Sequence, residues 1–247
     1  MKEKSDKKAF LAASGILQDF LNSPRPNQEM KINFELSPSV KDLFEARGIP
    51  HTAVYKIEVN GIEKSFDYNV KDSDHIKLFP YKTTEHSDDI FVSPSAFIAD
   101  IHLGKLAKTL RLLGLDCIFN KDWDDEKIIA SSNSKQRMIL TRDLELLKNG
   151  RTHYGYWIRS TNPDEQINEL FERFDLSDKI DPFTRCMKCN GLLEQVPLEQ
   201  IEEKVPPKVK KWHSEYWQCS SCNQVYWQGS HFKDLQQKVD ELVDRTH

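Results

Sequence analysis

The chain has 247 residues, enough for two or three domains that each bury a hydrophobic core. Its 39 acidic and 35 basic residues give a formal net charge of −4. This balance excludes binding to nucleic acid through bulk positive charge but permits a local basic patch. No apolar run approaches the length needed to cross a bilayer, so no membrane partner is expected.

The N-terminal stretch MKEKSDKKAFLAASGIL resembles a secretory signal mainly in its basic start. Its apolar part is short, runs into Gln18 and Asp19, and lacks a clear A-x-A cleavage site. A cytoplasmic location is therefore expected. In a reducing compartment, the five cysteines favour metal binding over disulfides.

The first zone, residues 6–82, is expected to be a small α+β domain. Its strand-like runs are KKAFLAAS, MKINFEL, AVYKIEV, EKSFDY and HIKLF. Asn60-Gly61 indicates a hairpin, because both residues tolerate positive φ. One amphipathic helix fits SVKDLFEARG, with Ser39 as its N-cap and Gly48 at its end. The polar tract in residues 83–92 indicates a linker.

The second zone, residues 93–180, alternates strands and helices. Strands are expected at AFIAD, DCIF, MILT and GYWIRS. Helices are expected at HLGKLAKTLRLLG, DDEKIIASSN, residues 144–148 and PDEQINELFERF. Repeated βα units predict an α/β fold with a parallel sheet and helices on its faces. The last zone, residues 181–247, carries four of the five cysteines and a helix around Lys233 to Val243.

Three successive strands of the second zone are followed by carboxylates. The acids are Asp100 at the end of AFIAD, Asp143 at the end of MILTRD and, after DCIF, Asp122, Asp124, Asp125 and Glu126. Ligands of open parallel sheets bind beyond the carboxyl ends of the strands, so these acids are expected to share a pocket. Clustered carboxylates repel unless cations neutralise them, and Mg²⁺ prefers oxygen ligands. Two such ions could activate water for phosphodiester hydrolysis.

Basic residues near these acids are candidates for contacts with a phosphate backbone. Lys105, Lys108 and Arg111 are expected on one face of the helix after Asp100, and Arg142 adjoins the acid at the end of MILTRD. An ordinary solvated helix face would explain the same pattern.

The acids also have structural explanations, because Asp is a common helix cap. Asp124 or Asp125 could cap DEKIIASSN, and Asp143 could cap LELLKNG. By composition, a phosphate-accepting receiver domain or a phosphatase also stays open. The stretch Asp100-Ile101-His102 lacks the Asp-x-Asp pair of one phosphatase pattern, which weakens that alternative.

Two Cys-x-x-Cys pairs, in RCMKCNG and QCSSCNQ, predict a metal site in the last zone. Cys186, Cys189, Cys219 and Cys222 complete the ligand set of a tetrahedral Cys₄ site, typical of structural zinc. Four protein ligands leave no open position, so catalysis at this metal is not expected. Cys117, inside DCIF, is expected to be a small buried hydrophobe.

Aromatic residues surround the second cysteine pair: Trp212, Tyr216, Trp217, Tyr226 and Trp227. They could stack on exposed bases, or they could pack a ribbon that is too small for its own core. His231 is expected to be structural, because four better ligands already serve the metal.

These motifs together resemble the Mut-seven C-terminal ribonuclease domain, a PIN-like nuclease with a fused zinc ribbon. The resemblance rests on FIADIHLGKLAKTLRLLG, DDEKI, MILTRDLELL, RCMKCNGLLE and YWQCSSCNQVYWQGSH, in this order, and spans roughly Ser93 to Leu235. The segments SVKDLFEARGIPHTAVYKIEVNG and HIKLFP resemble the ubiquitin-like β-grasp domain often found ahead of this nuclease.

The resemblance implies a PIN-like fold and RNA cleavage that depends on Mg²⁺ or Mn²⁺. It maps metal-binding acids to Asp100, Asp143 and Asp125, with Asp124 or Glu126 as alternatives to Asp125. A fourth acid, common in PIN nucleases, has no clear position, and Asp164 is one option.

The partners implied are RNA and zinc, with a ribosome, a tRNA or a second copy of the chain left open. The β-grasp domain also resembles sulfur carriers and ubiquitin-like modifiers, which act through a free C-terminal diglycine. Here the last strand continues through Pro80-Tyr81 without Gly-Gly, so RNA or protein docking is favoured. The main rival function is a non-catalytic RNA- or ribosome-binding adaptor.

Overall fold

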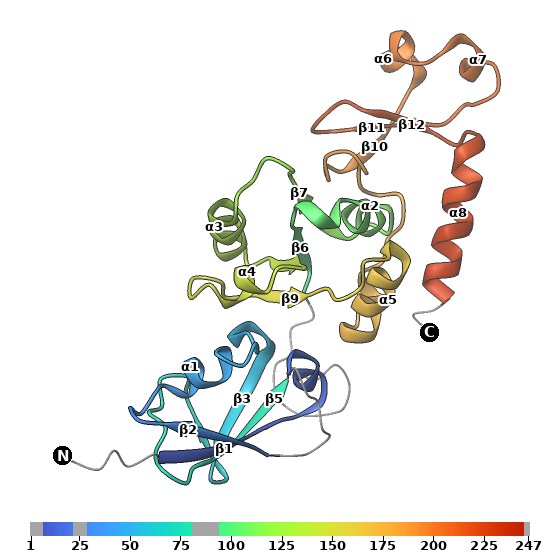
Figure 1. Cartoon of the computed structure of the whole chain (residues 1–247). Helices are drawn as coiled ribbons and strands as arrows, with labels where there is room; N and C mark the ends of the chain where they lie inside the picture. The colour runs from blue at the N-terminus through green and yellow to red at the C-terminus, as the bar shows by residue number, and fades with distance from the viewer. Residues whose placement is uncertain (1–6, 22–28, 81–93, 245–247) are drawn as a thin grey trace. The chain divides into compact units, whose positions relative to one another are not determined.

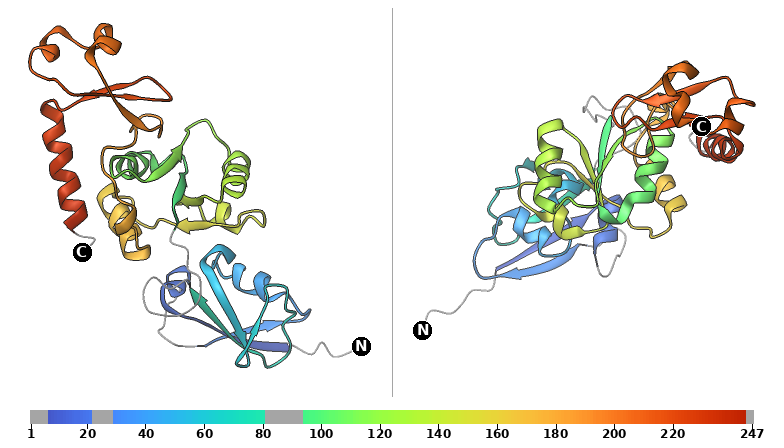
Figure 2. Two further views of the ribbon diagram at one scale, coloured as in Figure 1. Left: turned by 180° about the vertical axis from the view of Figure 1, so that it is seen from behind. Right: turned by 90° about the horizontal axis from the view of Figure 1, so that it is seen from above.

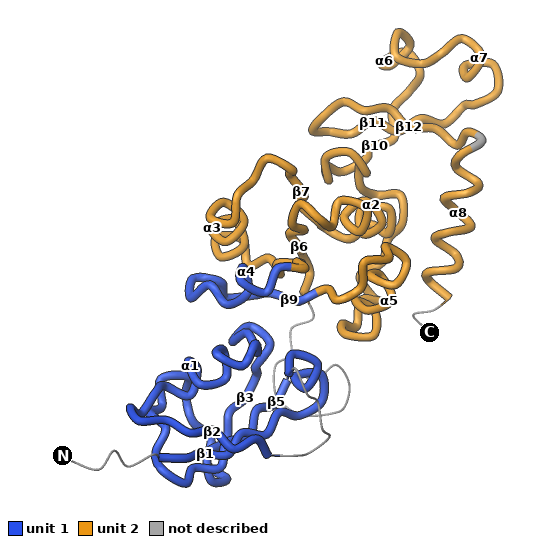
Figure 3. Tube along the Cα trace, in the orientation of Figure 1, with its two compact units in different colours: residues 1–91, 143–157 blue, residues 92–142, 158–247 orange. Residues whose placement is uncertain are grey.

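A computed structural model describes residues 7–21, 29–80 and 94–244 of the chain (Figure 1). The linker expected at residues 83–92 lies outside these ranges. The chain divides into two compact units: residues 1–91 with 143–157, and residues 92–142 with 158–247 (Figure 3). In the described part of the chain, no helix combines the length and the apolar character that a membrane span needs.

The first unit contains a five-stranded sheet in the order β2-β1-β5-β3-β4. Its strands are β1 (Lys7–Ala13), β2 (Met30–Phe34), β3 (Val54–Val59), β4 (Ile62–Lys64) and β5 (His75–Pro80). β1 runs parallel to β5, and the other pairs are antiparallel. The helix α1 (Val40–Glu45) and the short 3-10 helices η1 (Gly15–Phe20) and η2 (His51–Ala53) complete the β-grasp arrangement that the sequence predicted.

Alternation along β1 explains how this sheet acquires a core face. Ala9, Leu11 and Ala13 are buried while the residues between them are not, as the period of a strand requires. These side chains belong to the same buried cluster as Leu43 and Phe44 of α1. One face of the sheet is thus covered by the helix.

Turn chemistry sets the limits of the elements in this unit. Asn60 and Gly61, with φ of 52° and 78°, form the predicted hairpin between β3 and β4. Ser39 caps α1 as predicted, with its hydroxyl accepting from the Asp42 N–H at 3.0 Å. The predicted strand EKSFDY is wrong over residues 65–68, where the chain makes a turn. After the turn, Asn69 forms only an isolated β-bridge.

Residues 143–157 pack within the first unit. This segment contains α4 (Leu144–Lys148) and β9 (Gly155–Trp157). The His51 Nε2 atom lies 2.9 Å from the Thr152 carbonyl oxygen, and the rings of Phe20 and Trp157 are 4.9 Å apart. Thr152 is fully buried and donates to the Leu146 carbonyl at 2.8 Å. These contacts join the segment to the ubiquitin-like domain.

The second unit is built on a parallel sheet, as the alternating pattern predicted. β6 (Ala96–Ala99) lies between β7 (Asp116–Phe119) and β8 (Met138–Thr141) and runs parallel to both. Helices α2 (Gly104–Leu112) and α5 (Pro163–Arg173) lie on one face, and α3 (Asp125–Lys135) lies on the other (Figure 2). The carboxyl ends of these strands therefore share one edge of the sheet.

The end of α2 requires a glycine. Gly114 has φ of 81°, a left-handed conformation that side chains with a Cβ rarely adopt. A Cβ at this position would lie 2.0 Å from the Asp181 carbonyl oxygen. Backbone of the segment leading to the first cysteine pair therefore passes directly over this turn, and only glycine leaves room for it.

The C-terminal part forms a three-stranded antiparallel ribbon and a long helix. The ribbon strands are β10 (Leu193–Val196), β11 (Tyr216–Cys219) and β12 (Val225–Trp227), in that order. Between β10 and β11 lie α6 (Leu198–Ile201), η5 (Glu202–Lys204) and α7 (Pro207–Lys210). Helix α8 (Ser230–Val243) starts three residues before its expected beginning. The ribbon has its own small core of Ile201, Val205, Tyr216 and Val225.

Candidate active site and metal centre

Asp100 follows the last residue of β6 and lies beside the end of β8. Its backbone N–H donates to the Leu140 carbonyl at 3.0 Å, which extends the pairing of the two strands. The residue is 5 % exposed, and both carboxylate oxygens accept hydrogen bonds. Oδ1 accepts from the His102 N–H at 2.8 Å, and Oδ2 accepts from the Thr141 hydroxyl and, at 3.2 Å, from the Arg142 N–H. This carboxylate is therefore fixed at the carboxyl edge of the sheet.

The hydrogen bonds of Asp100 leave room for a ligand. A carboxylate has about four acceptor positions, two on each oxygen. Asp100 uses one position on Oδ1 and two on Oδ2, so one position on Oδ1 can still accept. No lysine or arginine within the described ranges forms an ion pair with it. A buried anion without a counter-ion is costly, and a divalent cation at Oδ1 would compensate that cost.

Asp143, next in the chain after Arg142, is exposed and caps α4. Its Oδ1 accepts from the Glu145 N–H at 2.8 Å. Asp143 therefore has the helix-capping role that is its structural explanation. Capping does not exclude a second role as a metal ligand, because a carboxylate has about four acceptor positions.

The three acids at the start of α3 divide into a cap and two residues of the first turn. Asp124 is the N-cap, with its side chain accepting from the Lys127 N–H at 2.8 Å. Asp125 and Glu126 lie exposed in the first turn, where the helix dipole stabilises negative charge. Asp122 lies exposed in the preceding loop. Capping by Asp124 is compatible with Asp125 or Glu126 as the middle acid of the predicted site, that is, the one between the two strand-end acids in the sequence.

The acids do not form a preassembled cluster in the described part of the chain. There, only the four cysteines make up a group of three or more potential ligands whose atoms all lie within 4.8 Å of one another. Asp164, the option for a fourth acid, is ion-paired with Lys238 of α8 at 3.0 Å.

Two of the predicted basic residues lie on α2, the helix that follows Asp100 in the chain. Lys105 and Lys108 are exposed on α2, and together with His102 and Phe119 they line a cavity of about 490 Å³. None of the described residues that line this cavity is acidic. A cavity with two lysines and no acid suits a phosphate group.

The predicted contact between Arg111 and RNA is contradicted by the burial of this side chain. Arg111 is 3 % exposed. Its Nε donates to the Cys117 carbonyl at 2.8 Å, and its Nη1 donates to the Met187 and Lys188 carbonyls, each at 3.1 Å. The first cysteine pair covers the end of α2, so this part of the basic face is not solvated. Arg142 is exposed.

The four cysteines come together as the spacing predicted. The Sγ atoms of Cys186 and Cys222 are 3.7 Å apart, and those of Cys189 and Cys219 are 3.3 Å apart. Tetrahedral zinc with metal–sulfur bonds of about 2.3 Å would place its sulfurs roughly 3.8 Å apart. Gly191 is needed here, because a Cβ would lie 2.8 Å from the Cys219 Sγ. The quartet could therefore bind zinc.

Hydrogen bonds prepare one of these thiols for metal binding. Burial opposes ionisation of Cys186, but the Tyr226 hydroxyl, 3.1 Å from its Sγ, and nearby backbone N–H groups lower the pKa of this thiol to about 7. The thiolate is the form that ligates metal. Tyr226 is thus a structural partner of the quartet.

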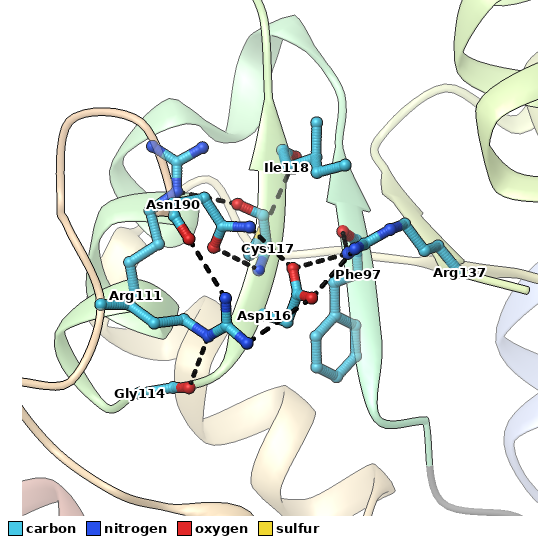
Figure 4. A network of polar contacts seen from close by, with 9 residues as sticks. Phe97, Arg111, Gly114, Asp116, Cys117, Ile118, Arg137 and Asn190 are labelled. Carbon is cyan, nitrogen blue, oxygen red and sulfur yellow. Dashed lines mark hydrogen bonds and ion pairs between the residues drawn. The ribbon is translucent and has the colours of Figure 1, made fainter. Parts of the chain in front are cut away.

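A polar network ties the first cysteine pair to the edge of the parallel sheet (Figure 4). Arg137 donates to both oxygens of Asp116 in β7, at 2.6 and 2.9 Å. The Asn190 side chain donates to Asp116 at 2.7 Å and accepts from the Cys117 N–H at 3.0 Å. Arg185 lies 3.6 Å from the same carboxylate. The metal site and the sheet therefore share one set of contacts.

Replacing Asp116 with asparagine is expected to destabilise the protein in a pH-dependent way. Burial raises the pKa of Asp116, but hydrogen bonds from Arg137 and Asn190 and the positive charges of Arg137 and Arg185 outweigh burial and lower it below its ordinary value of 3.8. The stabilisation by this carboxylate is therefore present above pH 3.8 and is lost as the pH falls through the lower folded-state pKa.

At neutral pH, urea unfolding should show a loss of about 1.5–3 kcal/mol in the Asp116→Asn variant, because hydrogen bonds between charged groups are lost. The gap between wild type and variant should narrow only below pH 3.8. Any zinc bound by the four cysteines would be lost from both proteins alike in acid, so their difference isolates the carboxylate. Equal unfolding free energies at neutral pH would contradict this role.

Some site residues were not found from the sequence. Thr141 had a usable signal, since it is a hydroxyl residue at the end of a buried strand, two positions before an acid. Asn190 directly follows a cysteine pair and has φ of 74°, a conformation that asparagine tolerates. The pairing of Asp116 with Arg137 has no local signal, because 21 positions of sequence separate the two residues.

Comparison with known families agrees with this arrangement. The Mut7-C RNAse domain matches residues 95–239, more than half of the chain, and the Mut7-C ubiquitin domain matches residues 7–86. No curated protein and no solved structure matches the chain. The first match contains the strand-end acids and all four cysteines, and it supports a nuclease-like function with RNA as the substrate. The chain therefore belongs to the Mut7-C RNAse domain family and carries a Mut7-C ubiquitin domain ahead of the nuclease domain.

Proposed function

We propose that this protein is a ribonuclease that uses Mg²⁺ or Mn²⁺ to hydrolyse phosphodiester bonds in RNA. The observation that carries the proposal is Asp100: a buried carboxylate at the carboxyl edge of the parallel sheet, with an unused acceptor position and no counter-ion among the described residues. A ligand site at this edge is the general rule for such sheets.

Asp100, Asp125 and Asp143 would hold the divalent ion, with Asp124 or Glu126 as alternatives for the middle position. When bound, the ion would activate a water molecule and stabilise the leaving oxygen. The three acids come from separate elements and repel one another when ionised. A divalent ion bound among them would offset this repulsion.

The basic residues around the site would position the substrate. Lys105 and Lys108 line the cavity at α2, so they would bind phosphate groups on either side of the reacting bond. Arg142, whose backbone N–H holds the Asp100 carboxylate, would extend an exposed guanidinium toward the RNA backbone. Each of these cationic side chains would offset part of the negative charge near the acids.

The proposed domain organisation is a ubiquitin-like domain over residues 6–82, a linker over 83–92, a nuclease domain over 93–180 and a zinc ribbon over 181–247. The ribbon would bind one structural zinc ion through its four cysteines. The proposed location is the cytoplasm. A ribosome, a tRNA or a second copy of the chain would be additional partners.

Asp100→Asn tests the proposal against a matched control, Asp122→Asn. Both substitutions remove one negative charge, but Asp122 is exposed and outside the proposed ligand set. Cleavage of end-labelled RNA in Mg²⁺ should fall more than about 100-fold in Asp100→Asn, since loss of a ligand should exceed the 10- to 100-fold typical of its supporting partners. Zinc content and unfolding midpoint identify a variant that is merely misfolded. Equal cleavage by both variants would refute the proposal.

A second candidate is a non-catalytic RNA-binding adaptor that retains the nuclease fold. The helix-capping roles of Asp124 and Asp143 favour it, because capping accounts for these acids without a bound ion. The adaptor predicts RNA binding that is indifferent to divalent ions and to Asp100→Asn. The cleavage assay above separates the two functions, provided that RNA binding is measured on the same samples.

A further inference from the structure

A cavity of about 940 Å³ lies between the zinc ribbon and α8. Three of the chain's five tryptophans line it: Trp212, Trp217 and Trp227. The neighbouring elements, the red helix α8 and the orange ribbon, are seen side by side in Figure 1 and from above in Figure 2. We call this space the aromatic groove.

Packing of the ribbon does not account for all of these rings. The ribbon core uses Tyr216, which is 1 % exposed, with Trp227 packed partly against it. Trp217 pairs with Tyr226 across β11 and β12, so these two rings share the opposite face of the ribbon. Trp212 follows α7 and is 83 % exposed. Trp212 is not part of the ribbon core, and its ring lines the groove, where a ligand can reach it.

The charge of the groove selects the kind of ligand. None of the described residues that line it is acidic, although the chain has more acidic than basic residues. Lys208, His213 and His231 contribute its basic groups, together with Arg185, whose guanidinium lies 3.6 Å from the Asp116 carboxylate. Lys210 on the same helix is paired with Glu202, whereas Lys208 forms no ion pair with any described residue.

The start of α8 adds to this polarity. Gly229 is the N-cap, no side chain caps the helix, and its first turn has no acidic residue. Gly229 and His231 both line the groove. The positive end of a 14-residue helix dipole therefore lies at the groove wall, beside the basic side chains.

We propose that the aromatic groove binds single-stranded RNA, with bases stacked on Trp212 and Trp217 and a phosphate held by Lys208. This inference rests on the proposed function and adds a binding site remote from the strand-end acids. Flat apolar rings with basic groups and no acid suit nucleic acid, because every base has a stacking face and every linkage carries a negative charge. An apolar peptide would use the rings but not the charge.

Trp212→Ala is the direct test, because removal of an exposed ring leaves the ribbon core intact. Binding of a labelled oligouridine of roughly eight nucleotides, within the range of single-strand sites, is measured by fluorescence anisotropy. The protein is full-length and zinc-loaded, and magnesium is omitted so that no cleavage occurs. The affinity should fall at least about fivefold, the lower limit for loss of one stacked base. The matched control is Tyr55→Ala, which removes an exposed ring from the ubiquitin-like domain and should bind like wild type.

Lys208→Ala tests the charge separately from the rings. The slope of log affinity against log salt should become shallower by about 0.7, the value for one contact with a single-stranded phosphate. Lys71→Ala, which removes an exposed lysine from the ubiquitin-like domain, should leave the slope unchanged. A lower affinity together with a shallower dependence of affinity on salt is expected when the lost contact was with a nucleic acid.

Unchanged RNA binding in both Trp212→Ala and Lys208→Ala would overturn the proposal. A change in sedimentation behaviour in Trp212→Ala, with RNA affinity unaffected, would also overturn it and would identify the groove as an interface between copies. The result is independent of the nuclease test. A protein that cleaves nothing can still lose RNA affinity on Trp212→Ala, and a nuclease inactivated by Asp100→Asn should still bind the oligonucleotide.

Discussion

Asp143→Asn is expected to remove RNA cleavage while leaving the fold intact. Asparagine is as good an N-cap as aspartate, so it can accept the Glu145 N–H as Asp143 does at 2.8 Å. What the substitution removes is the negative charge that a Mg²⁺ ligand needs. The single-turnover rate should therefore fall more than about 100-fold, while the thermal midpoint stays close to that of wild type. The measurement is cleavage of end-labelled RNA in Mg²⁺, beside a thermal scan.

The same substitution separates the two roles of this residue. If Asp143 is only a cap, Asp143→Asn should retain full activity, and Asp143→Ala should cost about 1 kcal/mol of stability. Asp122→Asn is the matched control, since it also removes one negative charge and Asp122 is exposed and outside the proposed ligand set. Full cleavage by Asp143→Asn would mean that this acid acts only as a helix cap.

Loss of zinc is the second large effect expected. Cys219→Ser should abolish zinc binding and unfold the ribbon, because the ribbon core contains few residues and zinc contributes on the order of 10 kcal/mol in comparable small domains. The disturbance should reach the parallel sheet, since the backbone beside Cys189 holds Arg111 and Asn190 against β7. Zinc released per chain and limited proteolysis of the ribbon measure both effects.

Cys117→Ala is the control for the cysteine quartet. Cys117 is fully buried in β7, and burial raises the pKa of its thiol to about 12, so it stays protonated and binds no metal. This variant should keep its zinc and lose only the stability associated with a small core cavity. Wild-type protein without zinc, or a zinc-loaded Cys219→Ser, would contradict the proposed metal centre.

The features that the sequence predicted well are those with a local cause. A βα repeat places Asp100 at the end of β6, because the strand is an apolar run and the acid ends it. The two Cys-x-x-Cys pairs specify one site, since each pair presents two thiols from a tight turn. The Asn60-Gly61 hairpin follows from the φ values that these residues tolerate.

The features that it predicted poorly depend on contacts between distant parts of the chain. Arg111 has the helical spacing of a solvated residue, but carbonyls from the first cysteine pair bury its guanidinium. The joining of residues 143–157 to the ubiquitin-like domain depends on His51 meeting Thr152, across 101 positions of sequence. Spacing along a helix gives the direction of a side chain but not what covers it.

The same limit applies to the strand-end acids. The alternating pattern places Asp100, Asp125 and Asp143 at strand ends, but it cannot give the distances between them. Asp125 and Asp143 belong to the starts of helices, whose positions depend on packing elsewhere. Acids are common at helix starts because they cap the helix and interact favourably with its dipole. Capping and metal binding therefore predict the same residue types at these positions.

The most direct test of the central claim is the dependence of RNA cleavage on Mg²⁺ in the wild-type protein. Zinc-loaded protein, dialysed free of magnesium, is mixed with single-stranded and structured RNAs while Mg²⁺ or Mn²⁺ is titrated back. Asp143→Asn, purified in parallel, reveals any contaminating ribonuclease. We predict cleavage that is absent without the divalent ion, saturates as the ion is added, and is lost in the variant. Cleavage that is independent of the ion, or equal in both proteins, would contradict an acidic, metal-dependent active site.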